Sequence, residues 1–276
     1  MATRVSPVPA TSPRTRSGAR WSFALREFRF WLTDYRRTWR GSVISSVLEP
    51  LLYLGAMGAG LGSLVNRHPH ASLGGVSYLV FIAPGLLAAT GMQTAFGEGM
   101  YPVLGSLKWH GNYLAAAATP LRPADVFRGH LLFVTGRITM NSGIFLGAVA
   151  AAGAARGPLA ALALPVAVLT GLGFASWLMA WAITRTRDTS FSALFRFGMI
   201  PMFLFSGTFF PISQLPAWLR PVAYVTPLWH GVALCRGLSL GTATASMALV
   251  QVAYLAAFAA AGIAAAHITY ARRLHV

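Results

Sequence analysis

Six apolar stretches constrain this chain more than any other feature of its sequence. They cover residues 43–65, 78–100, 127–152, 159–184, 191–207 and 243–270. A membrane-spanning helix needs roughly 20 residues, so five stretches qualify outright. The stretch at 191–207 is shorter, and we count it as a span because the apolar run continues to Phe210. The pattern predicts an all-α polytopic membrane protein with six transmembrane helices and both termini on the same side.

The charge of the chain supports this reading by its position. The chain carries 22 Lys and Arg against 6 Asp and Glu, a formal net charge of +16. In a soluble domain this excess would suggest nucleic acid, but only 10% of the residues are charged, against about 25% in globular domains. Nine arginines precede the first span, and the loops after the second, fourth and sixth spans are also basic. The positive-inside rule therefore predicts cytoplasmic termini in a bacterial plasma (inner) membrane, with no nucleic-acid partner.

The region before the first span divides into two parts. Residues 1–20 contain three prolines, four arginines and no acidic residue, which predicts a disordered cytoplasmic tail. Residues 21–40 place Trp21, Phe28, Trp31 and Tyr35 at helical spacing among arginines. Aromatic and basic residues in this pattern predict an amphipathic helix in the lipid headgroup plane. Residues 21–276 would then form one transmembrane domain, with spans between 43 and 270.

The residues that carry chemistry are few. The sequence has no GxxxxGK[ST] phosphate loop, no HExxH zinc motif and a single cysteine, so we expect no catalytic residue, metal site or cofactor in this chain. Ionisable groups in or near the spans are costly and are functional candidates. They are Glu49, Glu98 and Arg137, with Asn141 one turn beyond Arg137. An interhelical pair and a cargo contact both fit Arg137.

Three segments together resemble one known family. They are Glu49–Gly62 (EPLLYLGAMGAGLG), Tyr78–Ala88 (YLVFIAPGLLA) and Phe205–Pro216 (FSGTFFPISQLP), the last followed by PLWHG at 227–231. This ordered set resembles the permeases of type-2 ABC exporters, most of all those of the nodulation-factor (lipooligosaccharide) and daunorubicin-resistance type. The resemblance implies two permease copies, each bound to a cytoplasmic ABC ATPase that binds ATP and Mg²⁺. It also implies export from the cytoplasm or the inner leaflet.

The loop between the second and third spans resembles the coupling helix of that family. It has a helix-forming run at 113–118, ended by Thr119 and Pro120. We expect the ATPase contact to involve residues within this run and on both sides of it: Trp109, Tyr113, Leu114, Thr119, Pro120, Leu121 and Asp125. Asp125 can either cap the next helix or pair with a cation of the ATPase.

Residues 208–238 are too apolar for a solvated loop and are interrupted by four prolines. In the family that the chain resembles, this segment forms short re-entrant helices in the outer leaflet. Phe209 and Phe210, beside Pro211, are candidates for an apolar outer gate. Simple packing of the two aromatic rings is the alternative.

The resulting hypothesis is ATP-driven export of an amphipathic or lipid-linked cargo, either a drug-like molecule or a glycolipid. A homodimer of the chain, two ATPase subunits and membrane lipids are the expected partners. One alternative is a proton-coupled antiporter that uses Glu49 or Glu98 and needs no ATPase. Another is a membrane scaffold that transports nothing. The cargo itself is not specified by these residues.

Overall fold

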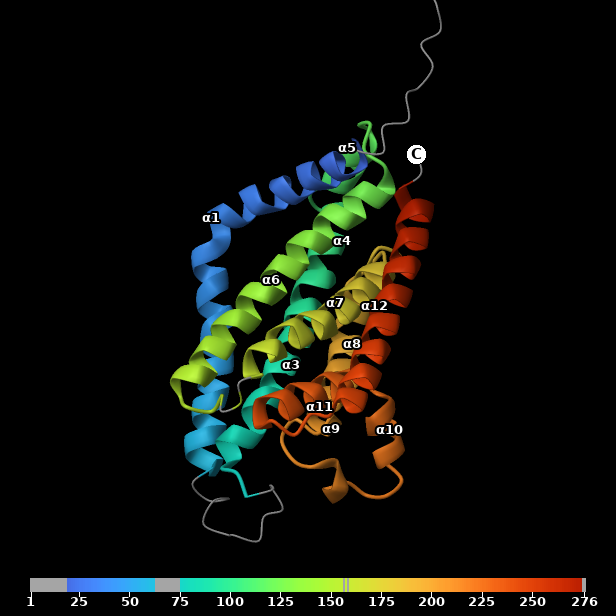
Figure 1. The fold of residues 1–276 in the computed structure, drawn as a ribbon. Helices are drawn as coiled ribbons and strands as arrows, with labels where there is room; N and C mark the ends of the chain where they lie inside the picture. Colours follow the sequence, from blue (N-terminus) through green and yellow to red (C-terminus); the bar gives the residue numbers. More distant parts are fainter. Residues whose placement is uncertain (1–18, 63–74, 156, 158, 275–276) are drawn as a thin grey trace, which may run out of the picture.

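The computed structural model describes residues 19–62, 75–155, 157 and 159–274. Within these ranges every regular element is a helix, and the long helices form a bundle (Figure 1). The predicted tail therefore lies almost wholly outside the described residues. The described part confirms the prediction of an all-helical chain.

Five helices in the described part are long: α1 Ala19–Gly55, α3 Tyr78–Gly99, α6 Pro123–Ala151, α7 Ala163–Ala182 and α12 Ala245–Leu274. The shorter elements connect them or extend them. They are η1 Ala56–Leu61, α4 Tyr101–Lys108, α5 Asn112–Ala117, η2 Ala160–Leu162, α8 Thr189–Leu194, η3 Phe195–Met199, α9 Ile200–Phe205, η4 Ile212–Gln214, α10 Arg220–Val225 and α11 Pro227–Leu240.

Four stretches of the described residues are long and apolar enough to cross a membrane, namely Tyr78–Lys108, Pro123–Ala151, Ala160–Ala182 and Ala245–Leu274. They agree with four of the six predicted spans and support a membrane-embedded protein. The fifth predicted span corresponds to the shorter helical stretch Thr189–Phe205. The first continues from α1 into η1, and its last residues lie outside the described ranges. A total of six spans stays a prediction.

Helix α1 joins two elements that the sequence pattern separates. The predicted interfacial helix at 21–40 and the predicted span from 43 are parts of one helix that continues to Gly55. Figure 1 shows that α1 bends: its first part crosses the beginning of α6, and its second part runs down beside α6. The chain changes direction between the predicted interfacial part and the predicted span, but it does so within the helix and without a loop.

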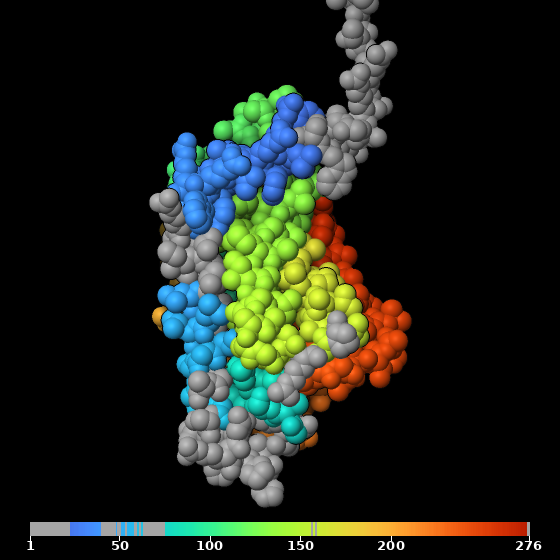
Figure 2. Space-filling model, turned by 60° about the vertical axis from the view of Figure 1, so that its left-hand side comes forward, coloured from blue at the N-terminus to red at the C-terminus, as the bar shows by residue number. Residues whose placement is uncertain are grey.

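Helix α3 lies at the centre of the bundle and packs against α6, α7 and α11, while α7 also packs against α12. Glycines permit the closest approach. A Cβ at Gly171 of α7 would lie 2.7 Å from the carbonyl oxygen of Gly91 in α3. Only a residue without a side chain fits such a backbone contact, which is typical of helix pairs in membranes. Figure 2 shows α6 on one face of the molecule, between α1 on one side and α7 and α12 on the other.

The bundle has two distinct ends. Helix α5 lies at the same end as the beginning of α1 and the end of α12 (Figure 1). Helices α10 and α11 lie at the opposite end. We call these the α5 end and the α10 end.

Candidate functional site

The candidate site is built around α5, at the α5 end of the bundle. Gly111 precedes α5 with a φ of +64°, a left-handed conformation that glycine adopts without strain. After α5, the Thr119 hydroxyl donates to the carbonyl of Ala116 at 2.7 Å and accepts from the amide of Leu121 at 3.3 Å. With Pro120 next in the chain, these bonds end the helix. The predicted helix at 113–118 is confirmed within one residue at each end.

Tyr113 of α5 points into the protein. Its side chain is completely buried, and its hydroxyl contacts Nδ1 of His130 in α6 and lies 3.3 Å from the Tyr270 hydroxyl of α12. His130 in turn stacks on Trp31 of α1, with ring centroids 3.8 Å apart. Burial and the neighbouring Tyr270 hydroxyl, with a smaller contribution from Glu27, raise the pKa of Tyr113 well above its ordinary value, so the hydroxyl stays protonated and available as a donor.

This burial corrects the expectation that Tyr113 reaches an ATPase directly. A ring buried against other helices of its own chain cannot also fill a pocket on another protein. Tyr113 instead fixes α5 to α6 and α12. The exposed large apolar side chains of the predicted set are Leu114, 47% exposed, and Trp109, 62% exposed.

The other predicted coupling residues occupy the turn after α5. Thr119 and Pro120 are exposed, and Leu121 is half-buried. Asp125 is buried, and its carboxylate accepts from the backbone amide of Arg122 at 3.2 Å. Of the two functions open to Asp125, the structure shows the cap of its own helix, α6.

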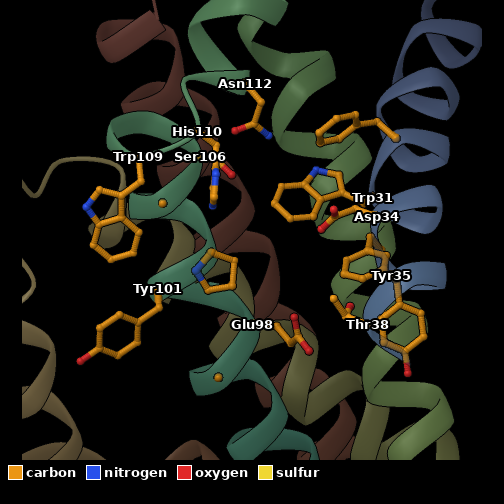
Figure 3. A pocket seen from close by; sticks show the side chains of 15 residues that line it. Trp31, Asp34, Tyr35, Thr38, Glu98, Tyr101, Ser106, Trp109, His110 and Asn112 are labelled. Carbon is orange, nitrogen blue, oxygen red and sulfur yellow. The ribbon is translucent and has the colours of Figure 1, made fainter. Parts of the chain in front are cut away.

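A cavity of about 720 Å³ opens beside α5, between the first part of α1 and the α3–α4 pair. Figure 3 shows Trp31, Asp34, Tyr35 and Thr38 of α1 on one side, opposite Ser106 and His110. Six of the lining residues are aromatic, namely Phe30, Trp31, Tyr35, Tyr101, Trp109 and Phe133, although the rings of Tyr101 and Trp109 point away from α1 (Figure 3). The carboxylates of Asp34 and Glu98 also line it. The cavity was not predicted, because it depends on how α1 crosses the other helices.

An ion pair lies beside this cavity and joins two of the predicted intramembrane residues. Nε of Arg137 in α6 donates to Glu98 of α3 at 2.9 Å. The Arg137 guanidinium also donates to the Tyr35 hydroxyl and lies 4.3 Å from the centre of that ring. Asn141, one turn on, donates to Thr94 at 3.1 Å. Arg137 and Asn141 thus both form interhelical contacts. For Arg137, an interhelical pair was one of the two interpretations of the sequence.

Glu49 stands apart from this group. It lies in α1, but its side chain is outside the described residues. Among the described residues, no group of three His, Cys, Asp or Glu side chains is placed to hold a metal ion.

The predicted gate residues are at the α10 end, and their rings go to different clusters. Phe209 packs against the main core, with its ring centroid 5.0 Å from that of Phe203. Phe210 packs on a separate cluster of Ile212, Leu215 and Ala223. Pro211, half-buried, has extended backbone before η4. The structure does not bring the two rings together as one apolar seal.

The sequence did not predict the contacts of Arg236 in α11, which connects several segments at this end. Its Nε donates to the carbonyl of Phe81 at 3.1 Å, and its guanidinium also donates to the carbonyls of Gly207 at 2.8 Å and Thr208 at 3.3 Å. The carbonyl of Phe81 lies in the first turn of α3, and those of Gly207 and Thr208 follow the end of α9. One guanidinium therefore binds backbone acceptors of two separate segments. The sequence signal was an arginine inside a mostly apolar helix.

His130 was also missed. It lies near the start of α6, and only the folded chain brings Tyr113 and Trp31 to it. A histidine among apolar residues in a predicted span was the available signal.

Comparison with known proteins places these features in a family. Residues 24–240 match the family described as ABC-2 type transporter. Nodulation protein J of Rhizobium leguminosarum bv. trifolii is 34% identical over 219 residues, which cover 76% of this chain and 81% of that protein. Nodulation protein J of Rhizobium meliloti (strain 1021) is 30% identical, with 77% and 82% covered. That of Bradyrhizobium diazoefficiens is 29% identical, with 88% and 94% covered. The family predicted from the sequence motifs is confirmed: the chain belongs to the ABC-2 type transporters and is a membrane-embedded transport subunit of that family.

Proposed function

We propose that this chain is the permease of an ATP-driven exporter, and that α5 is the element through which a separate ATPase moves it. The chain contains no phosphate loop, so the energy of ATP has to reach it across a protein interface. ATP and Mg²⁺ would be bound by two cytoplasmic ABC ATPase subunits. A second copy of this permease would complete the transporter.

The observation that carries the proposal is the way α5 is held. Its inner side is fixed by the buried Tyr113 to α6 and α12. Its outer side presents Leu114, beside the exposed Trp109 at the end of α4. A short helix that is anchored inward and apolar outward suits the transmission of force from a partner to the bundle.

The orientation proposed for the chain places the α5 end in the cytoplasm of a bacterium, with the bundle in the inner membrane. The distribution of arginines and the lysine in the sequence favours this orientation. The position of the beginning of α1 and the end of α12 at the α5 end supports it, since both termini would then face the cytoplasm.

The proposed cargo is amphipathic or lipid-linked, such as a drug-like molecule or a glycolipid. The sparse charge of the helices supports an apolar part in the cargo. The curated relatives are nodulation proteins by name, which supports the lipooligosaccharide class within this range. Proton antiport gains no support from Glu98, because its carboxylate is engaged by Arg137.

The experiment compares alanine variants of two exposed leucines in the purified complex. The chain is expressed with a candidate ABC ATPase and reconstituted in liposomes. Leu114→Ala should weaken the copurification of the ATPase and abolish ATP-dependent transport, because interface anchors commonly contribute about 2 kcal/mol or more. Leu249→Ala, on the exposed face of α12 at 71% exposure, should change neither. Full ATPase retention and transport in Leu114→Ala would refute α5 as the coupling element.

A further inference from the structure

We propose that the cavity between α1 and the α3–α4 pair binds an organic ammonium group attached to an apolar body. The residues facing this cavity differ sharply in charge from the rest of the chain. The chain has 22 basic residues and only 6 acidic ones, yet two of the six acids, Asp34 and Glu98, line this cavity. None of the 15 described residues that line it is Lys or Arg.

The local charge fits a single positive group. Glu98 is already paired with Arg137 at 2.9 Å, so its charge is largely neutralised. No ion pair in the described part of the chain involves Asp34, which is exposed to the cavity side of α1. Arg26, Arg29, Arg36 and Arg37 belong to the same helix but do not line the cavity. One carboxylate is therefore left to attract one cation.

The lining also offers the other contacts that an ammonium group uses. Aromatic faces attract organic cations, and Phe30, which is 48% exposed, lines the cavity together with Trp31, Tyr35 and Phe133. Asn112 also lines it, and the Oδ1 acceptor of this side chain is buried without a hydrogen-bond partner among the described atoms. A buried acceptor without a partner is unfavourable, and an N–H or O–H of a bound molecule would satisfy it.

The position of the cavity sets what else the molecule contains. One wall is the part of α1 whose aromatic and basic pattern is typical of the headgroup region, and the volume of about 720 Å³ lies in the range of ligand sites. An amine in the headgroup of a lipid and the amine of a free amphipathic compound share this chemistry. The use of the cavity as an entrance for cargo rests on the proposed export function, whereas binding itself does not.

The test measures binding to the full chain purified in dodecyl maltoside, without ATPase or ATP, so that its outcome is independent of transport. Benzyltrimethylammonium is the probe, followed by equilibrium dialysis of the labelled compound. We expect saturable binding to the wild type and roughly tenfold weaker binding to Asp34→Asn, the effect of removing one partly exposed charge. Asp188→Asn, the same change at an acid outside the cavity, should leave the affinity unchanged.

Two further measurements complete the test. Neopentylbenzene has the shape of the probe without its charge, and it should compete poorly. Added phosphatidylethanolamine that displaces the probe better than phosphatidylglycerol would identify a lipid amine as the occupant, and equal effects of the two lipids would identify a free amphipathic ammonium compound. The proposal is overturned if wild-type binding is not saturable, if Asp34→Asn binds like the wild type, or if neopentylbenzene competes equally.

Discussion

The hydroxyl of Tyr113 in α5 lies 3.3 Å from the hydroxyl of Tyr270 in α12, although 157 positions separate the two residues. His130 of α6 contacts the same Tyr113 hydroxyl. The buried side chain of Tyr113 therefore connects the short helix α5 to two of the longest helices, α6 and α12. A displacement of α5 cannot occur without a response from α6 and α12.

Removal of the Tyr113 hydroxyl tests this anchor with little change in volume. Tyr113→Phe leaves the buried Nδ1 of His130 without its partner, which should cost about 1–3 kcal/mol. The free energy of unfolding in a mixed-micelle denaturation would show the loss. Tyr224→Phe, at a tyrosine that is 45% exposed, provides the matched control and should be neutral. Equal stability of the two variants would mean that the buried hydroxyl contributes nothing.

The ion pair of Glu98 and Arg137 should show strong energetic coupling. Glu98→Gln leaves a nearly buried guanidinium without its counter-ion, a change that typically costs about 3 kcal/mol or more. Arg137→Met alone leaves the carboxylate of Glu98 without its counter-ion. The double variant should lose less than the sum of the two single variants, by more than about 1 kcal/mol. Additive losses in the unfolding measurements would contradict a pair that acts as a unit.

Phe209 and Phe210 should behave independently, because their rings belong to different clusters. We expect the stability losses of Phe209→Ala and Phe210→Ala to add within about 0.5 kcal/mol in the double variant. The ratio of ATP hydrolysed to cargo exported should be the same in the two single variants. A strongly non-additive loss, or an uncoupling seen only in the double variant, would restore the hypothesis of a joint gate.

Stability should fall as the pH rises through the titration of Glu27. Burial raises the pKa of Glu27 from 4.5 to about 6, although the hydrogen bond from the Trp31 indole lowers it. The folded chain thus binds this proton more tightly than the unfolded chain, so the ionised carboxylate is destabilising above about pH 6.

Glu27→Gln keeps an acceptor for Trp31 and has no charge at any pH. Thermal unfolding on both sides of the window from 4.5 to 6 should show equal stabilities at the acid side. Above it, the variant should be more stable by at most about 2 kcal/mol. A difference between wild type and variant that does not change with pH would contradict the assignment.

The fold was predictable to the extent that it depends on local pattern. Apolar length alone located the helices that contain α3, α6, α7 and α12, and Thr119 with Pro120 correctly predicted the end of α5. The pattern could not show which way Tyr113 points, because a six-residue helix has too few turns to define an apolar face. The pattern also divided α1 into two elements, at residues 21–40 and from 43 onward, which form one continuous helix in the structure.

The residue partners were less predictable than the residues themselves. Arg137 and Glu98 stood out individually, since ionisable groups are rare in apolar stretches, but their pairing depends on how α3 and α6 cross. Phe209 and Phe210 are adjacent in sequence and were grouped for that reason. In the non-helical segment before η4, successive side chains diverge into different clusters.

The glycine contact between α3 and α7 limits the motions that are open to this subunit. With Gly91 and Gly171 backbone to backbone, neither helix can slide along the other without bringing a side chain into a space that holds none. The close contact therefore favours an α3–α7 pair that moves together. We therefore expect a rearrangement during transport to take place around that pair, in α1, in the helices α6 and α12 that hold α5, in the short α8–α9 segment or at the boundary with another subunit.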